Sequence, residues 1–273
     1  PIGLSLLLML GLNQLRFTEA VGNPISIRLI QGNFEQRLSW NPSAIQQQIR
    51  FYSTAIEQQA ADLIITPETA FPWPEKDLPS ESLPKLRTFV QESHSNVLLG
   101  IIGIVPKANG DLRYSNRALG FSPSRNGLYH YDKSHLVPFG EFIPPGFQWF
   151  VDAFKVPLSD FARGTMSQPP FQIERLGQDS IGAAITICYE DVFGNELASR
   201  IRHSETPVNL LINMTNLAWF GRSQAPSQQL RLSQMRSIET GLPSIRSTNT
   251  GITAVIGPDG RVLQALPQWT QAS

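Results

Sequence analysis

The chain has 273 residues, of which 41% are hydrophobic and 16% charged, and its 22 basic side chains balance its 22 acidic ones. That length can bury a sizeable core in one large domain or two small ones. A net charge of zero without a strongly basic run argues against a nucleic-acid partner, and the single cysteine, Cys188, excludes an intrachain disulfide and a zinc site of several thiolates.

The chain starts with an uncharged apolar segment, Pro1 to Leu12. It is too short to cross a bilayer, which needs about 20 apolar residues. It also lacks the initial Met, the positive residues and the small-residue cleavage site of a secretory signal peptide. We interpret residues 1–22 as the end of a transmembrane helix and its connector, with a buried N-terminal helix as the alternative.

From residue 25 onward, patterns typical of strands alternate with patterns typical of helices. Residues 25–30 predict a strand, and Asn41 followed by Pro42 predicts the start of a helix, because Asn is a favoured N-cap and Pro suits the first helical position. The buried side of this helix is expected at Ile45, Ile49, Tyr52 and Ile56. The next expected elements are a buried strand at 63–65, a helix at 84–94, a long strand at 97–105, a hairpin turn at Asn109–Gly110, and strands near 118–121 and 128–131.

The second half starts with a long excursion, residues 139–170, which is rich in Pro and aromatic side chains. After it we expect a buried strand at 181–187, a helix at 195–201, a strand at 208–212, a helix at 227–240, and strands at 244–247, 253–256 and 261–266. Strands that alternate with helices early and pair through hairpins later predict an α/β layered domain with a mixed sheet. No linker interrupts residues 25–266, so we treat them as one domain.

Three chemically reactive side chains follow predicted strands. Glu68 comes after the strand at 63–65, Lys133 after the strand at 128–131, and Cys188 after the strand at 181–187. The carboxyl ends of strands are where α/β folds place functional groups. Each residue alone is nevertheless more typical of an ordinary role: an exposed loop glutamate, a solvated lysine and a small buried cysteine.

The contexts of these residues, taken together, resemble the nitrilase superfamily of carbon–nitrogen hydrolases. They are Thr-Pro-Glu at 66–68, a segment from Asp132 to Glu141, and Ile-Cys-Tyr-Glu at 187–190. The second is longer than the general superfamily motif, and its Leu-Val-Pro-Phe-Gly-Glu ending resembles the apolipoprotein N-acyltransferases, which act last in bacterial lipoprotein maturation. Further matches lie at 31–33, Trp40, 218–221, 246–249 and 251–254, so that the resemblance covers about residues 25–269.

This resemblance implies a fold and a location. The family has an α-β-β-α sandwich catalytic domain, here residues 23–273, inserted among transmembrane helices. That domain faces the periplasm from the bacterial inner membrane. The apolar start would then be the end of one membrane helix, and the chain would stop before the family's final one.

The resemblance also implies an N-acyltransferase. The enzyme would move an acyl chain from a phospholipid, through a Cys188 thioester, to the α-amino group of the diacylglyceryl-cysteine of a lipoprotein. The residue types suit that chemistry: Glu68 can take the thiol proton, Cys188 can attack the ester carbonyl, and Lys133 can stabilise the oxyanion together with a backbone N–H near Tyr189. Neither a metal nor an organic cofactor is required.

Other residues match supporting positions of the family. Glu141 and Glu190 are expected to support the triad, by orienting Lys133 and holding local charge. Tyr189 is a further supporting residue and, with Trp40, matches positions that shape the acyl pocket. Trp219 is expected to bind substrate. His135 has no second His or Cys near it in the sequence, so we interpret it as structural.

Two departures from the family pattern leave other functions open. Leu217 replaces an acidic residue, and Gln229 stands where a histidine is usual. One alternative function is a soluble amidase or nitrile hydrolase with the same triad and water as acceptor, although the apolar start and the aromatic residues in 147–154 favour a lipid substrate. The other is a degenerate paralogue that binds lipid or lipoprotein without catalysis.

Overall fold

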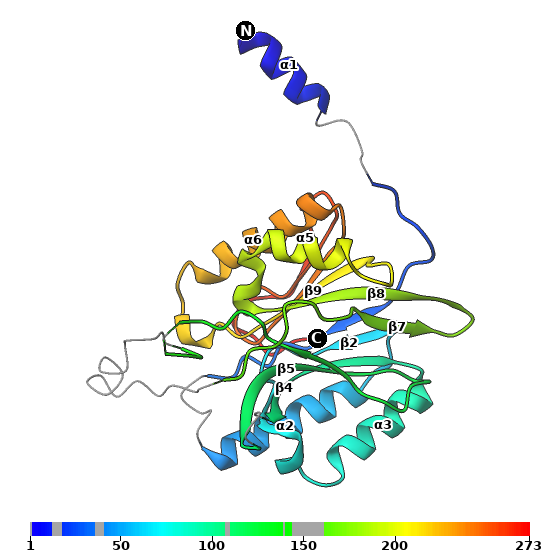
Figure 1. The fold of residues 1–273 in the computed structure, drawn as a ribbon, viewed down its shortest axis with the longest axis vertical. Helices are drawn as coiled ribbons and strands as arrows, with labels where there is room; N and C mark the ends of the chain where they lie inside the picture. The colour runs from blue at the N-terminus through cyan, green and yellow to red at the C-terminus, as the bar shows by residue number, and fades with distance from the viewer. Residues whose placement is uncertain (1, 13–17, 36–40, 107–109, 139, 144–160) are drawn as a thin grey trace.

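The protein is described here by a computed structural model, which covers residues 2–12, 18–35, 41–106, 110–138, 140–143 and 161–273. Within these residues, two six-stranded sheets pack face to face, and helices cover both outer faces (Figure 1). Both sheets mix parallel and antiparallel pairs. The expected α-β-β-α sandwich is therefore confirmed.

The first sheet has the strand order β1-β2-β4-β5-β6, and β3 pairs with β4 beside this path. Its strands are β1 Ile27–Leu29, β2 Leu63–Ile65, β3 Phe71–Pro74, β4 Asn96–Pro106, β5 Leu112–Phe121 and β6 Tyr129–Asp132. The long antiparallel β4–β5 pair confirms the predicted hairpin, although residues 107–109 lie outside the described residues. The short strand β3 is absent from the sequence-based expectation.

Helices α2 (Pro42–Glu57) and α3 (Ser82–Ser93) cover the outer face of the first sheet. The start of α2 agrees with the prediction, because the Asn41 side chain accepts a hydrogen bond from Ser43 N at 3.0 Å and Pro42 is the first helical residue. The stripe predicted from the 3.6-residue period is the side of α2 that is buried against the sheet.

The second sheet has the order β12-β11-β10-β9-β8-β7. Its strands are β7 Phe171–Arg175, β8 Gln178–Ile187, β9 Leu210–Thr215, β10 Ser244–Thr248, β11 Ala254–Ile256 and β12 Val262–Ala265. Helices α5 (Gly194–Arg202) and α6 (Ala225–Thr240) cover its outer face, and three short 3₁₀ helices complete the described elements: η2 Glu75–Asp77, η3 Cys188–Val192 and η4 Ala218–Phe220. Strand β7, which pairs with β8, is a second element that the sequence analysis does not contain.

The core between the sheets is apolar. Leu98 and Ile65 from the first sheet pack with Ile185 and Ile212 from the second, and all four side chains are fully buried. Parallel strands that are covered on both faces have nearly continuous apolar sequences, and for this reason residues 63–65 and 181–187 could be predicted as strands. Glu68 and Cys188 follow these two runs, and Lys133 follows β6, so the packing of the two sheets decides where the three side chains meet.

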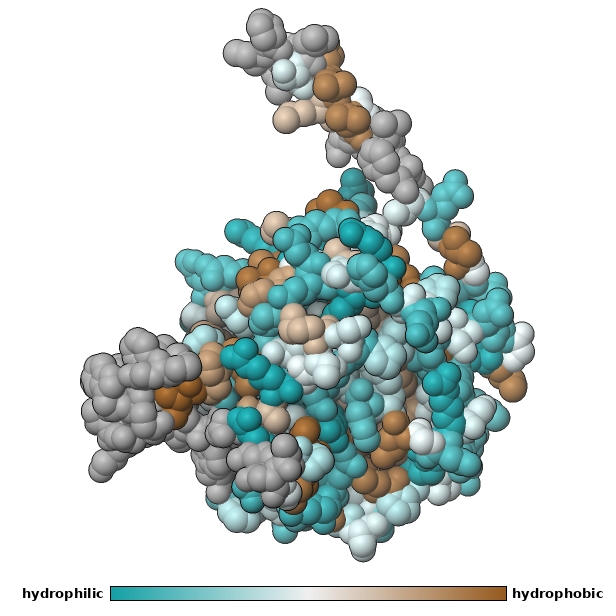
Figure 2. All heavy atoms as spheres, viewed as in Figure 1, coloured by the Kyte–Doolittle hydropathy of each residue, from teal (hydrophilic) through white to brown (hydrophobic). Residues whose placement is uncertain are grey.

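The apolar start forms α1, Ile2–Leu12, which stands away from the sandwich in Figure 1. Leu7, Leu8, Met9 and Leu10 are each more than half exposed, and Figure 2 shows brown, hydrophobic atoms among the coloured residues of this helix. Across the described ranges, no helix has both the length and the apolar character needed to cross a bilayer.

Candidate active site

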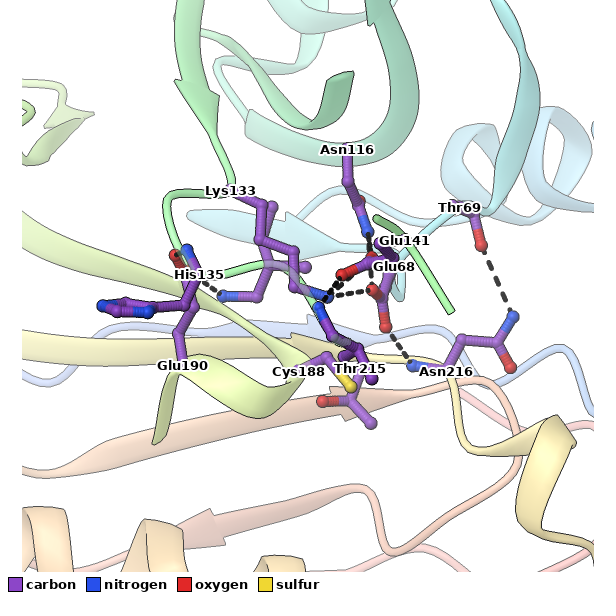
Figure 3. A network of polar contacts seen from close by, with 12 residues as sticks. Glu68, Thr69, Asn116, Lys133, His135, Glu141, Cys188, Glu190, Thr215 and Asn216 are labelled. Atoms are coloured by element: carbon purple, nitrogen blue, oxygen red, sulfur yellow. Dashed lines mark hydrogen bonds and ion pairs between the residues drawn. The ribbon is translucent and has the colours of Figure 1, made fainter. Parts of the chain in front are cut away.

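Three strand ends meet at one edge of the sandwich and bring the three predicted residues together (Figure 3). Glu68 follows β2, Lys133 follows β6, and Cys188 follows β8 as the first residue of η3. The Lys133 ammonium donates a hydrogen bond to Glu68 Oε1 at 3.2 Å, and the Cys188 sulfur lies beside this pair. All three residues are buried, with 6%, 1% and 9% of their surface exposed for Glu68, Lys133 and Cys188.

Close backbone packing sets the position of Glu68. A Cβ atom at Gly100 of β4 would lie 2.0 Å from Pro67 O and 2.8 Å from Glu68 Cα, so only glycine lets the loop cross this strand. The next residue, Thr69, has a φ of 51°, in the left-handed region that non-glycine residues seldom adopt. The loop therefore turns sharply and directs the Glu68 carboxylate between the two sheets.

Cys188 also occupies a tight turn. Its φ is 53°, at the point where β8 ends and η3 begins. A non-glycine residue in this conformation costs about 1–3 kcal/mol and persists only where the surroundings hold it. Here Asn213 Nδ2 donates to the Cys188 carbonyl at 3.2 Å, and thus links the turn to the neighbouring strand β9.

The Glu68 carboxylate is held from both sheets. Oε1 accepts hydrogen bonds from Asn116 Nδ2 at 2.7 Å and from Lys133, and Oε2 accepts one from Asn216 N at 2.7 Å. Burial raises the pKa of Glu68, and this effect outweighs the lowering by the Lys133 charge and by the two other donors. Glu68 is thus a stronger base than an exposed glutamate, held in one orientation.

Lys133 remains an ammonium in this buried position because two carboxylates face it. Its Nζ donates to Glu141 Oε1 at 2.8 Å in addition to Glu68. Burial alone would lower the pKa of Lys133, but Glu68, the Cys188 sulfur and Glu141 together raise it above its ordinary value. Glu141 therefore forms a direct ion pair with Lys133, at the position where the sequence predicts a supporting residue.

Asn116 is a site residue that the sequence analysis missed. Its Nδ2 donates hydrogen bonds to Glu68 Oε1 at 2.7 Å and to Glu141 Oε1 at 3.0 Å. Its backbone carbonyl accepts a hydrogen bond from Lys133 N at 2.8 Å. One residue therefore contacts two carboxylates and the lysine backbone. A signal was present: Asn116 lies in the buried polar run Ser115–Arg117, directly before the buried residues 118–121 of the same strand.

The charges around Cys188 have opposing effects on its thiol. Burial raises the pKa of Cys188 to about 12, and the nearby Glu68 carboxylate acts in the same direction. Lys133 and the Gln229 amide oppose this rise. At neutral pH the resting side chain is therefore a thiol, and the sulfur has to lose its proton to a neighbouring base during any attack.

Glu190 hydrogen-bonds the backbone that follows Lys133, at Ser134 N and His135 N, and among the described residues it forms no ion pair with the ammonium. Its carboxylate accepts five hydrogen bonds, from Ile187 N, Tyr131 OH, Ser134 N, Ser134 Oγ and His135 N, at distances of 2.6–3.1 Å. These donors come from β8, β6 and the segment that follows Lys133. Glu190 thus ties the lysine loop to the strand that ends at Cys188.

We expect Glu190→Gln to destabilise the protein by roughly 2–3 kcal/mol, because an amide turns an NH₂ group toward donors that need an acceptor. Misplacement of the Lys133 loop should also lower activity. Urea unfolding with a matched Glu92→Gln variant on the exposed side of α3 checks this. Equal midpoints for the two variants would contradict the role assigned to Glu190.

The remaining predicted residues differ in position. The Tyr189 ring packs edge to face on Phe193 at 5.3 Å, next to the turn, whereas Trp219 is 62% exposed on η4. Trp40 and the aromatic residues in 147–154 lie outside the described residues. His135 stacks on Phe193, with ring centroids 3.7 Å apart, and bonds to Glu196, which agrees with a structural role.

The two departures from the family pattern also have distinct surroundings. Leu217 is 2% exposed and turns its side chain into the protein between Asn216 and η4. Gln229, on α6, donates from Nε2 to the Cys188 sulfur at 3.6 Å. Gln229 thus forms a hydrogen bond with a member of the predicted triad.

A pocket of about 450 Å³ lies beside the segment that carries Lys133 and Glu141, and its described lining includes none of the three triad residues. Its walls are Val105, Pro106, Leu136, Phe142, Ile143, Phe161 and Ala162, with the side chains of Arg113 and Arg163. Leu136 and Phe142 belong to the segment that carries Lys133 and Glu141, so the pocket and the buried charges share one loop. In the described residues, no cluster of three or more His, Cys, Asp or Glu is placed to hold a metal ion.

Comparison with known proteins places this geometry in a family. The carbon–nitrogen hydrolase model matches residues 26–272. The chain is 45% identical over 259 residues to an apolipoprotein N-acyltransferase of Ralstonia nicotianae, covering 95% of the chain and 48% of that protein. It is 39% identical to one of Nitrosomonas europaea, covering 96% of the chain and 50% of that protein. The chain thus spans about half the length of the curated relatives it matches.

Solved structures of low sequence identity share the fold. A mutant of an amidase from Nesterenkonia superposes with a TM-score of 0.61 at 18% identity, covering 93% of this chain and 90% of that one. A CN-hydrolase superfamily protein of Xanthomonas campestris gives a TM-score of 0.60 at 19% identity, covering 90% of this chain and 87% of that one. At such identities the likeness concerns the fold alone.

Proposed function

The chain belongs to the carbon–nitrogen hydrolase family, and from this premise we propose that it is the catalytic domain of an apolipoprotein N-acyltransferase. The observation that carries the proposal is the buried contact between Glu68 and Lys133 beside Cys188. Similarity to curated relatives of that name over 95% of the chain supports the choice within the family.

In the first half-reaction, Cys188 attacks the ester carbonyl of a phospholipid. The S–H proton passes to Glu68 as the S–C bond forms, and the carbonyl oxygen becomes an oxyanion that the Lys133 ammonium stabilises. The intermediate then collapses, the C–O bond to the glycerol oxygen breaks, and protonated Glu68 returns the proton to this oxygen. The products are a lysophospholipid and an acyl thioester on Cys188.

In the second half-reaction, the α-amino group of a diacylglyceryl-cysteine attacks this thioester. A new N–C bond forms, Glu68 takes a proton from the nitrogen, and Lys133 again faces the oxyanion. The C–S bond breaks, and the sulfur recovers a proton from Glu68. The N-acylated lipoprotein leaves, and this order of events predicts ping-pong kinetics.

The surrounding residues support these roles. Glu141 hydrogen-bonds Lys133, and Asn116 hydrogen-bonds Glu68, which fixes the positions of the two side chains. Glu190 fixes the backbone that follows Lys133. The pocket beside Phe142 joins apolar walls to two guanidinium groups, which suits an acyl chain with an anionic headgroup. Tyr189, Trp40 and Trp219 remain candidates for contacts with acyl chain and substrate.

The proposal also includes the membrane. We interpret residues 1–22 as the end of a membrane helix and its connector, and residues 23–273 as a catalytic domain facing the periplasm from the bacterial inner membrane. The exposed leucines of α1 support this interpretation, because exposed apolar side chains gain stability in an apolar environment such as a bilayer.

The test is an assay that offers two kinds of substrate to the protein in detergent micelles. One mixture contains phospholipid and a diacylated lipopeptide, and the other contains simple amides and nitriles. We expect triacylated lipopeptide and lysophospholipid in equal amounts from the first mixture. Turnover of the amides alone would overturn the acyl-transfer proposal and favour a soluble amidase.

The substitutions at Leu217 and Gln229 support one other candidate, a paralogue that binds lipid without chemistry. Intact mass measurement after incubation with phospholipid separates the two. An acyl adduct on the peptide that contains Cys188 is expected of the transferase. An unmodified peptide together with saturable lipid binding would favour the paralogue.

The pH dependence of kcat/KM follows from the environment of Glu68. Burial raises the pKa of Glu68 above its ordinary value of 4.5, and the base has to be deprotonated to act. We therefore expect activity to rise with pH through a midpoint above that value. No loss from Lys133 is expected near pH 9, because its pKa is raised above 10.5. An acid midpoint at or below that of an exposed glutamate would contradict Glu68 as the base.

A further inference from the structure

The amide of Gln229 approaches the Cys188 sulfur from a different element than the Glu68–Lys133 pair. Gln229 lies on the first turns of α6, and its Nε2 donates to Sγ at 3.6 Å. Sulfur is a large, weak acceptor, so this distance corresponds to a hydrogen bond that strengthens when the sulfur becomes negative. The contact therefore involves an atom that reacts in the proposed mechanism.

A buried arginine fixes the orientation of this amide. Arg246 on β10 is fully buried, and its Nη2 donates to Gln229 Oε1. A guanidinium only donates hydrogen bonds, so the Gln229 oxygen has to face Arg246 and the NH₂ group has to face the sulfur. The amide therefore cannot flip without losing both contacts.

Arg246 is itself held in one position. Its Nη1 donates to Asn213 Oδ1 and Ser233 Oγ, each at 3.0 Å, and lies 3.6 Å from Asp191 Oδ2. Ser233 also donates to Asp191, at 2.5 Å. The carboxylate, guanidinium and amide thus form a continuous chain of contacts that ends at the nucleophile.

We propose that Gln229 is a catalytic residue that hydrogen-bonds the Cys188 sulfur whenever the sulfur carries negative charge, with Arg246 as its positioning residue. This inference rests on the proposed acyl transfer. The sulfur gains negative charge twice: when its proton leaves for Glu68 during attack on the ester, and when the C–S bond breaks and the electron pair returns to sulfur. Gln229 donates a hydrogen bond at both moments and transfers no proton itself.

The hydrogen-bond donor that faces the sulfur is the side-chain amide of Gln229. An amide does not titrate near neutral pH, so its donor is present at every working pH, whereas an imidazole gains and loses a charge there. The charged groups that act on the sulfur are Glu68, Lys133, Glu141 and Arg246. Among them, Glu68 has a pKa that burial raises above its ordinary value.

The test measures thiolate formation without any lipid. Iodoacetamide modifies the thiolate form, and Cys188 is the one cysteine of this chain, so alkylation of its peptide against pH reports this sulfur. Gln229→Glu keeps the size and the Arg246 contact but replaces the donor by a carboxylate. We expect its alkylation at a given pH to slow about tenfold or more, which is the effect of losing one hydrogen bond to a charged atom.

Three further variants complete the experiment. Gln229→His supplies another N–H donor and should keep most of the wild-type alkylation rate. Gln228→Glu is the control, since Gln228 is the exposed neighbour of Gln229 on α6, and it should leave the pH profile of alkylation unchanged. Gln229→Met has no donor and no charge, and should shift the profile in the same direction as Gln229→Glu. Should the glutamate variant fail to fold, as judged by circular dichroism, the methionine variant provides the measurement.

The two half-reactions give a second readout. Breakdown of the preformed Cys188 thioester by lipopeptide should slow in Gln229→Glu by at least the factor seen in alkylation, because the departing sulfur loses its donor. Wild-type alkylation profiles in both Gln229→Glu and Gln229→Met would overturn the inference. Absence of acyl transfer in the wild type, with the alkylation shift present, would instead overturn the proposed function and leave the sulfur contact standing.

Discussion

Replacing Cys188 by alanine should remove acyl transfer altogether, with a loss of at least about 10⁴ in kcat, which is the size expected when a covalent nucleophile is deleted. The physical reason is that no other thiol exists in the chain to accept the acyl group. Glu68 and Lys133 could still polarise an ester toward water, but this route lacks the covalent intermediate that links donor and acceptor. Quantitative mass spectrometry of lipopeptide and lysophospholipid measures the effect.

The fold of this variant should survive. Cys188 is a small side chain, and its replacement removes one sulfur atom from the rim of the core, at an expected cost of roughly 1 kcal/mol. Cys188→Ser is the matched control, since it keeps the shape and replaces the sulfur by a much weaker nucleophile. Residual transfer by Cys188→Ala within a hundredfold of wild type would exclude the thioester mechanism.

Replacing Lys133 by methionine should have the largest combined effect on activity and stability. The ammonium is 1% exposed and is the shared partner of Glu68 and Glu141. Methionine fills much of the same volume, but it leaves the buried Glu68 carboxyl group and the partly buried Glu141 carboxyl group, which Asn116 bridges, without their cation. Breaking a buried pair in this way costs about 3–5 kcal/mol.

The expected loss of activity has two causes. The oxyanion loses its charged donor, worth roughly 10²–10³ in rate. In addition, the pKa of Glu68 rises further without the Lys133 charge, since that charge opposes the effect of burial. More of the base is then protonated at neutral pH, so the acid limb of the pH–rate profile should move to higher pH in this variant.

Stability against pH gives a separate check on Lys133→Met. Carboxyl groups whose pKa is raised in the folded state bind protons that the unfolded chain has released, so the folded variant gains stability as the pH falls toward the unfolded pKa. Its deficit relative to wild type should therefore shrink at acid pH. The double variant Lys133→Met with Glu141→Gln should recover part of the stability and none of the activity.

Lys85→Met is the control for the loss of a lysine ion pair. Lys85 pairs with Glu57 at 2.7 Å, but its side chain is 66% exposed, and such pairs contribute about 0–1 kcal/mol. A Lys133→Met variant that loses no more stability than Lys85→Met would contradict the shared-cation arrangement.

Local patterns in the sequence predicted most of the described elements. The N-cap and buried stripe of α2, the long strand β4 and the apolar strand that ends at Cys188 all follow from side-chain period and turn chemistry within a few residues. The strands β3 and β7 were missed because their own residues carry no clear strand pattern. Phe71–Pro74 contains two prolines, and Phe171–Arg175 follows a Pro-rich segment, so their pairing depends on the strands beside them.

Sequence patterns alone identified most of the segments that form the sandwich, and they placed Glu68, Lys133 and Cys188 at the ends of strands. The surroundings of these three side chains depend on how the two sheets and α6 pack together. Glu68 bonds to Lys133 across 65 positions of the chain and to Asn216 N across 148, and Gln229 reaches the sulfur across 41. Such contacts leave no local periodic signal, because packing of the two sheets and α6 creates them. The basicity of Glu68 and the charge on Lys133 arise from the same packing, since burial and neighbouring charge act through space.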